Sequence, residues 1–303
     1  MRKLLKWTGL SVGSLALVVV LAVLVVYAAS EVRFRRAYDE VAVAPLRTGQ
    51  GNPAALERGR HLATAIAKCV DCHGADLGGK LFMDAGPLGV VYASNLTAGK
   101  GGVLARYSDG QLERAIRHGV DADGHALAIM PSADYWAMGD ADVQAVIAYV
   151  RTLPPVDREL PTTNVRALGR ALYLAGKLPL FPAEHITHGA PRAEPPAAGV
   201  TVEYGQYLAT IGGCRGCHGK DLNGAAEGEG PGMPPAANLT AAGEVGKWTE
   251  QDFFNALRTG KRPNGTALRP PMPWALSGLM TDDEMRAVWL YIRSVPARPT
   301  PTE

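Results

Sequence analysis

Two short motifs of cysteine and histidine are the residues best suited to chemistry in this 303-residue chain. They occupy Cys69–His73, with the sequence CVDCH, and Cys214–His218, with the sequence CRGCH. Together they contain all four cysteines of the protein. A C-x-x-C-H arrangement is typical of c-type haem attachment, while a bare C-x-x-C also occurs in thiol–disulfide redox pairs and in halves of zinc sites.

Haem attachment is the chemistry that fits both motifs. In each, two thiols on one helical turn can add to the two vinyl groups of one porphyrin, and His73 or His218 then faces the iron. The attaching residues are Cys69, Cys72, Cys214 and Cys217. A thioredoxin-like pair needs a βαβ context that this sequence lacks, and zinc needs further cysteines or paired histidines. The sequence therefore predicts two haem c groups, each with its iron.

The two motifs belong to an internal repeat, which places the flanking residues in register. The clearest pairs are Gly59 with Gly205, Leu62-Ala63-Thr64 with Leu208-Ala209-Thr210, Asn95-Leu96-Thr97 with Asn238-Leu239-Thr240, Met130-Pro131 with Met272-Pro273, and Tyr149-Val150-Arg151 with Tyr291-Ile292-Arg293. The repeat defines module 1, residues 53–155, and module 2, residues 199–297. Residues 156–198 have no partner in the repeat, and we interpret them as a linker.

Each iron needs a second axial ligand or has an open site, and two methionines are the best candidates for that ligand. Met130 and Met272 are equivalent in the repeat, and each is followed by proline. Because proline fixes φ and lacks an N–H, a Met-Pro turn holds the thioether in one place. We expect Met130 and Met272 to be axial ligands, which favours an electron carrier over an enzyme.

Other residues were weighed for the same position. His118 and His125 lie in module 1, but their equivalents are Thr259 and Thr266, which cannot ligate haem iron. Three methionines at or in the last helices are expected to fill the core instead. They are Met138, Met280 and Met285.

Several repeated polar and aromatic residues are expected to support the haems. Arg117 and Arg258 are candidates for haem-propionate contacts, with a solvated helix face as the alternative. Tyr107 and Trp248 are expected to pack on the haem edges. The Asn-Leu-Thr triplets match a glycosylation pattern, but their repetition inside the haem loops favours a structural hydrogen-bonding role.

The fold class predicted from these patterns is all-α, with an N-terminal transmembrane helix, two tandem helical modules and an irregular linker. In each module one helix precedes the motif, and a second begins at Ser108 or Thr249 in a capping box. A third begins near Asp140 or at Thr281 and ends before a proline. The proline-rich linker leaves room for one helix near residues 165–176.

The N-terminus combines three basic residues with an apolar run from Trp7 to Ala29. A hydrocarbon core of ~30 Å needs about 20 apolar residues, so residues 1–30 can form a membrane anchor. A cleaved signal peptide has the same polarity but a shorter apolar region, and it is the alternative. Haem c is attached outside the bacterial inner (plasma) membrane, so we expect a cytoplasmic N-terminus and periplasmic haem domains.

The composition argues against other classes of partner. The formal net charge is +2, and no basic tract with interleaved aromatic residues is present, so the sequence gives no sign of nucleic-acid binding. The 35 glycines and 22 prolines predict short helices joined by shaped loops.

Each module resembles a class I cytochrome c domain in its order of helix, C-x-x-C-H, Gly-rich loop, Met-Pro and final helix with tyrosine. The paired Asn-Leu-Thr and Met-Pro loops are similar to those of the membrane-bound cytochrome c subunits of periplasmic alcohol, gluconate, aldehyde and nicotinate dehydrogenases. The resemblance implies an electron carrier. Its donor would be a periplasmic dehydrogenase or another redox protein, and its acceptor a terminal oxidase, a quinone or a soluble cytochrome.

Two alternative functions stay open from the sequence. The chain could be a free-standing shuttle between a quinol-oxidising complex and a terminal oxidase. It could also be a di-haem enzyme of the peroxidase or thiosulfate dehydrogenase type, which needs one iron with an open site and is disfavoured by two methionine ligands.

Overall fold

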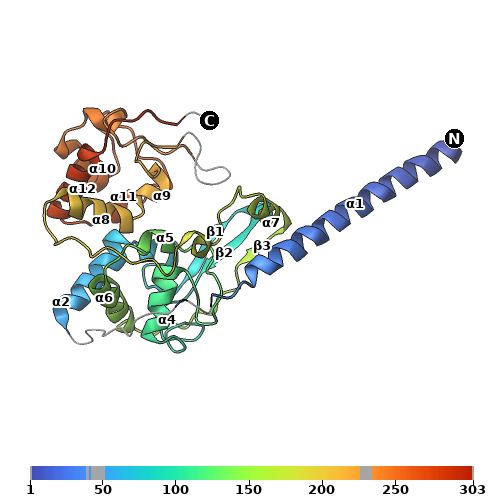
Figure 1. Cartoon of the computed structure of the whole chain (residues 1–303), viewed down its shortest axis with the longest axis horizontal. Coiled ribbons are helices and arrows are strands. Elements are labelled where there is room, and N and C mark those ends of the chain that lie inside the picture. Colours follow the sequence, from blue (N-terminus) through green and yellow to red (C-terminus); the bar gives the residue numbers. More distant parts are fainter. Residues whose placement is uncertain (1, 39–40, 42–51, 226–233, 302–303) are drawn as a thin grey trace.

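The computed structural model describes residues 2–38, 41, 52–225 and 234–301. One long helix, α1 (Arg2–Phe34), projects from a two-part body, and module 1 is the part next to it (Figure 1). The stretch Lys6–Phe34 is long and apolar enough to cross a membrane, and none of its most apolar window is buried. The expected N-terminal helix is therefore present, and its apolar surface is exposed over most of its length.

The helices of module 1 follow the predicted order around the first motif. They are α2 (Pro53–His61), α3 (Cys69–His73), α4 (Asp109–Glu113), α5 (Ser132–Tyr135) and α6 (Asp140–Arg151). Two π-helical turns, Leu62–Ile66 and Arg114–His118, continue α2 and α4. The predicted capping box at Ser108 is confirmed, because its side chain and that of Gln111 each bond the other's backbone N–H.

Module 2 repeats this arrangement. Its helices are α8 (Val202–Ile211), α9 (Cys214–His218), α10 (Glu250–Thr259), α11 (Trp274–Ser277) and α12 (Asp282–Ser294), with a 3-10 turn at Glu244–Lys247. The capping box predicted at Thr249 begins α10, and a further capping box at Thr281 begins α12 at the predicted start of that helix. Short helices thus begin and end where side-chain caps and glycines satisfy the backbone.

The first and last helices of each module cross at a repeated glycine. A Cβ on Gly59 would lie 1.9 Å from the carbonyl oxygen of Ala145, and a Cβ on Gly205 would lie 1.9 Å from that of Ala287. Any larger side chain would force the two backbones apart. This close crossing explains why both positions of the repeat are glycine.

A small antiparallel sheet in module 1 corrects the all-α prediction. Its strands are β1 (Lys80–Asp84), β2 (Gly89–Ala93) and β3 (Asn164–Val165), in the order β1-β2-β3, with the 3-10 turn Gly86–Leu88 between the first two. The register pairs Leu81 with Tyr92 and Gly89 with Val165. The molecule is mostly helical, and β1 (KLFMD) and β2 (GVVYA) do not alternate apolar with polar residues, so no period-2 pattern marks them.

The linker packs against module 1 and adds the third strand of this sheet. It contributes β3, the helix α7 (Ala167–Leu174) and the 3-10 turn Pro182–His185. The expected helix within residues 165–176 is therefore confirmed. Its helix α7 lies beside the end of α1, where Arg170 donates to the Ser30 Oγ at 2.8 Å and pairs with Glu31 at 2.9 Å.

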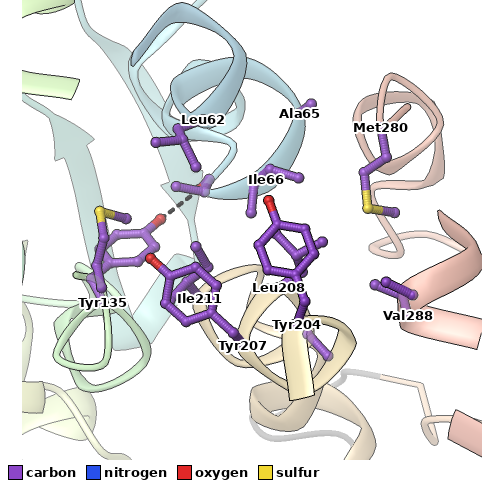
Figure 2. Close-up of a cluster of buried hydrophobic side chains, with 14 of the residues drawn as sticks. Leu62, Ala65, Ile66, Tyr135, Tyr204, Tyr207, Leu208, Ile211, Met280 and Val288 are labelled. Atoms are coloured by element: carbon purple, nitrogen blue, oxygen red, sulfur yellow. Dashed lines mark hydrogen bonds between the residues drawn. The ribbon is translucent and has the colours of Figure 1, made fainter. Parts of the chain in front are cut away.

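One hydrophobic core runs through both modules. Leu62 and Ile66 of the first π-helical turn meet Leu208 and Ile211 of α8 across the module boundary (Figure 2). All four side chains are at most 2% exposed. The repeat units therefore pack into one continuous core instead of two separate ones, and this holds the two motifs in a fixed relation.

A network of charged groups lies at the same boundary. The Arg58 guanidinium binds both carboxylate oxygens of Asp142 at 3.0 Å and one oxygen of Glu284 at 3.3 Å. His61 Nε2 lies 2.7 Å from the other oxygen of Glu284. Because Arg58 and His61 belong to α2 and Glu284 to α12, the network ties module 1 to module 2.

Replacing Glu284 with glutamine should remove most of the acid sensitivity of this boundary. Burial raises the pKa of Glu284, but its bonds to His61 and to the Thr281 backbone outweigh burial and leave the pKa below its usual value. A lowered pKa contributes stability that is complete above about pH 4.5 and is lost as the pH falls further. At pH 7 we expect E284Q to have about 2 kcal/mol less unfolding free energy than the unmodified protein. Between pH 7 and pH 3.5 the variant itself should lose little further stability at this boundary.

Urea unfolding at several pH values would measure this effect. Glutamine keeps the capping box, so the substitution isolates the charge. The control is Asp283→Asn, which changes an exposed carboxylate of the same helical turn. Equal acid sensitivity in E284Q and in the unmodified protein would contradict the assignment.

Candidate haem sites

Module 1 encloses a cavity of about 450 Å³ beside its motif. Cys69, Cys72 and His73 line it, and so does Met130. Its apolar lining includes Leu96, Leu112, Ile116, Val146, Ile147 and Val150. A space of this size, with two thiols, an imidazole and a thioether at its wall and hydrocarbon around them, suits a flat apolar cofactor. The structure therefore brings together the four site residues that the sequence predicts for module 1.

Residues in the left-handed region bracket both motif helices. Lys68 and Gly213 precede α3 and α9 with φ of 54° and 71°, and Gly74 and Gly219 follow them with φ of 84° and 81°. The chain therefore turns sharply into and out of one helical turn in both modules. Glycine adopts this conformation without strain, which leaves Lys68 as the unusual member of the set.

The two motif histidines are held in the same orientation. His73 Nδ1 lies 2.7 Å from the carbonyl oxygen of Ser94, and His218 Nδ1 lies 2.8 Å from that of Ala237. Since a carbonyl only accepts, each Nδ1 carries the proton and leaves Nε2 with a lone pair. Burial lowers the pKa of both histidines, which favours the neutral imidazole. This is how proteins orient a histidine whose other nitrogen binds a metal.

The two Met-Pro turns also have one geometry. Pro131 and Pro273 have φ of −78° and −82° and ψ of 49° and 52°. In both turns the backbone N–H two residues after the methionine donates to the methionine carbonyl, at 2.7 Å from Ser132 and 2.9 Å from Trp274. Met130 and Met272 are both partly buried against the core. The equivalence inferred from the repeat is therefore matched by the backbone.

The Asn-Leu-Thr triplets clamp the loop that orients each histidine. Asn95 Oδ1 accepts from the N–H and hydroxyl of Thr97 at 2.9 and 2.8 Å, and its Nδ2 donates to the Val156 carbonyl at 2.7 Å. Asn238 makes the same bonds to Thr240 and to the Arg298 carbonyl. Both asparagines are buried, which confirms the expected structural role. Each directly follows the residue whose carbonyl binds the motif histidine.

Replacing Asn95 with alanine should destabilise module 1 by about 1–3 kcal/mol, because buried partners lose their hydrogen bonds. Denaturant unfolding measures the change. Asn255→Ala is the control, since Asn255 is exposed on α10 and its loss should cost under about 0.5 kcal/mol. Equal stabilities of the two variants would show that the clamp contributes nothing.

The two alternative uses of C-x-x-C find no support. Redox-active thiols have a lowered pKa, whereas burial raises the pKa of the Cys69 thiol to about 12 and of the Cys72 thiol to about 11. Within the described residues, no group of three or more histidine, cysteine or acidic side chains is placed to hold a metal ion. Thioether formation with a haem needs neither property.

Comparison with known proteins agrees with this geometry. The family model for cytochrome c matches residues 56–154 and 202–296, which are most of both modules. The chain belongs to the cytochrome c family. The cofactor implied by this family is haem c, and the thiols, oriented histidines and cavity described above fit it.

The relatives of this cytochrome c include components of several dehydrogenases. A nicotinate dehydrogenase subunit of Pseudomonas putida is 31% identical over 85% of this chain and 23% of its own length. The fructose dehydrogenase cytochrome subunit of Gluconobacter japonicus is 29% identical over 80% of this chain and 53% of its own. The gluconate 2-dehydrogenase cytochrome c subunit of Pantoea cypripedii is 28% identical, with 84% and 63% covered. The chain thus spans less than two thirds of each.

The arginines expected at the haem propionates have other partners in this cytochrome c. Arg117 is fully buried and donates to Glu113 at 2.6 Å and to the Met138 carbonyl at 2.7 Å, and it pairs with Asp140 at 2.7 Å. It does not line the cavity. Its amino groups are already bonded to residues of module 1, so the structure does not support the predicted propionate contact. The alternative, a solvated helix face, is wrong for Arg117 because this side chain is buried.

Arg258 has the equivalent role in module 2. It donates to the carbonyls of Gly278 and Met280 and pairs with Asp282 at 2.8 Å. Both arginines therefore brace the chain between the Met-Pro turn and the last helix. The repeat contained a signal for this, since an aspartate at the start of the last helix accompanies each arginine.

The histidines considered as alternative ligands lie away from the cavity lining. His118 is buried, with its Nδ1 2.9 Å from that of His188 and its ring edge-on to Trp136. His125 lies by Asp121 near the surface. Tyr107 lines the cavity, and Trp248 packs partly buried against the core. Met138, Met280 and Met285 are buried, as expected for core residues.

Residues far from the motif complete the cavity, and sequence reasoning missed them. Phe34 comes from the end of α1, Arg170 from α7 and Phe181 from the linker. The Phe34 and Phe181 rings meet edge to face at 4.9 Å. No local pattern marks these residues, because they belong to segments without partners in the repeat.

Proposed function

We propose that this chain is a membrane-anchored, periplasmic di-haem cytochrome c that transfers electrons from a dehydrogenase to the respiratory chain. The observation that carries the proposal is the repeated site: each module presents a C-x-x-C-H helix, an oriented histidine and a Met-Pro turn of one geometry. Bound haem would supply one-electron chemistry at its iron.

The roles proposed for the site residues follow from their positions. Cys69 and Cys72 would hold one haem covalently through thioethers, with His73 and Met130 as axial ligands. The second haem would be held in the same way by Cys214, Cys217, His218 and Met272. The apolar wall would exclude water, and Arg170 is better placed than Arg117 for a propionate because it lines the cavity.

A carrier fits better than an enzyme because both axial positions have a candidate ligand in both modules. An enzyme would need an iron with an open or displaceable position. The backbone at both Met-Pro turns is closed by a hydrogen bond, which favours permanent ligation. The chain's own contribution is to hold these ligands still, so that little reorganisation accompanies each electron.

The anchor is proposed from α1 and its junction with module 1. The Arg170 guanidinium lies 4.6 Å from the Tyr27 ring centroid and 4.3 Å from that of Phe34. Aromatic and basic residues of this kind gather where a membrane helix leaves the hydrocarbon. With residues 1–30 as an uncleaved anchor, the N-terminus would be cytoplasmic, and domains 53–155 and 199–297 with linker 156–198 would be periplasmic.

The donor is proposed from the names of the relatives, which are subunits of nicotinate, fructose and gluconate dehydrogenases. A dehydrogenase would deliver electrons to an exposed haem edge, and a quinone, a terminal oxidase or a soluble cytochrome would accept them.

Gentle solubilisation of native membranes and purification of the full chain would test the proposal. We expect two covalent haems per chain, co-purification with a dehydrogenase and reduction of both haems on addition of its substrate. Release by alkaline carbonate would exclude the anchor. Purification of the chain alone, with reduction by quinol, would favour the free shuttle, and rapid carbon monoxide binding to a reduced haem would favour an enzyme.

A further inference from the structure

Lys68 is a partly buried cation that touches the attachment region of both modules. It directly precedes Cys69 and lines the cavity of module 1. Its Nζ donates to the Ile66 carbonyl at 2.8 Å and, across the module boundary, to the Gly212 carbonyl at 2.8 Å. Because Gly212 lies two residues before Cys214, the ammonium group sits between the starts of the two motif helices.

Asp134 supplies an opposite charge at the same place. It belongs to α5 of module 1, and its Oδ2 lies 3.5 and 3.4 Å from where a Cβ on Gly213 or Gly216 would be. Its carboxylate therefore faces the backbone of α9, the second motif helix. Burial lowers the pKa of Lys68, while the charges of Asp71 and Asp134 act in the opposite direction. Lys68 and Asp134 thus both contact the start of α9 from module 1, and we call these two residues the charged bridge.

The charged bridge is absent from the repeated framework. The position of Lys68 is Gly213 in module 2, and the position of Asp134 is Leu276. Lys68 has φ of 54°, where its glycine equivalent is less strained. Binding one haem per module thus needs neither charge, because module 2 has the same site geometry without them. The two charged side chains therefore lie where module 1 contacts the second motif helix, and not in the part of the site that the modules share.

We propose that Lys68 is a positioning residue that fixes the second motif helix against the first and that its charge raises the reduction potentials of the two haems. This inference rests on the proposed pair of haems. Reduction lowers the positive charge of the iron by one, so a nearby cation stabilises the reduced form. Asp134 acts in the opposite sense.

Redox titration of the detergent-solubilised, full-length holoprotein, followed by haem absorbance, tests the proposal. The variants are Lys68→Met, Lys68→Arg and Asp134→Asn. We expect K68M to lower the equilibrium constant for reduction of one haem about tenfold, or about 59 mV for a one-electron couple, and that of the other haem by less. K68R should stay within about threefold of the unmodified protein.

D134N should shift the same component upward, and it tests the charge even if K68M does not assemble. Unchanged potentials in both K68M and D134N would overturn the proposal, and so would downward shifts in both. Haem content per chain is measured first on the same samples. A chain with one haem refutes the di-haem function, whereas two haems with unmoved potentials refute only the role of Lys68.

Discussion

Replacing Met130 with alanine will convert the first haem from a closed electron carrier to one with an open iron. The absorption band of methionine-ligated ferric haem will lose about half its intensity, since the second haem keeps Met272. The reduced variant will bind carbon monoxide at one haem per chain. Loss of the thioether will also lower the potential of that haem by on the order of 100 mV, within the range of ~0.8 V that axial ligands set.

Met138→Leu is the matched control, because Met138 lines the same cavity but is expected to fill the core. This variant should keep the full band and bind no carbon monoxide. Met272→Ala should reproduce the Met130→Ala result on the other haem. An unchanged spectrum in Met130→Ala would refute the ligand assignment and direct attention to another residue of the cavity.

Removing both thiols of the first motif, as Cys69→Ser with Cys72→Ser, will reduce covalent haem from two per chain to one. The cavity of about 450 Å³ would then be unfilled or would collapse. Because large cavities are costly and this one lies in the core shared by both modules, we expect a loss of about 5 kcal/mol or more in unfolding free energy.

Intact mass and haem-to-protein ratio measure the attachment, and thermal unfolding measures the stability. The reciprocal variant, Cys214→Ser with Cys217→Ser, should also retain one haem. Retention of two covalent haems by either variant is the outcome that would falsify the assignment of the motifs. If the variant that lacks Cys69 and Cys72 is degraded, the haem content of the variant that lacks Cys214 and Cys217 still tests the assignment.

The prediction of the sites rests on local patterns. The C-x-x-C-H motif needs only five consecutive residues, so it is visible in the sequence. The capping boxes at Ser108, Thr249 and Thr281 are equally local and are all present. The methionines were chosen by the repeat, and the backbone of both Met-Pro turns agrees with that choice.

Predictions that depended on a distant partner did less well. Arg117 was a candidate for a propionate contact or for a solvated helix face, but it is buried and pairs with Glu113 and Asp140. The partner of a charged side chain depends on which groups the fold brings near it. The sheet was missed for a similar reason. Its strand β3 has two residues and pairs with β2, which lies far earlier in the chain.

The sequence by itself determined that this chain has two equivalent modules, each with a C-x-x-C-H motif, and it selected His73, Met130 and their equivalents as candidate ligands. Only the tertiary structure decided how those sites relate. The two modules share one core, α1 and the linker complete the first cavity, and Lys68 joins the two motif helices. Motifs and repeats are local and periodic, whereas these contacts join segments whose proximity depends on the packing of the whole chain.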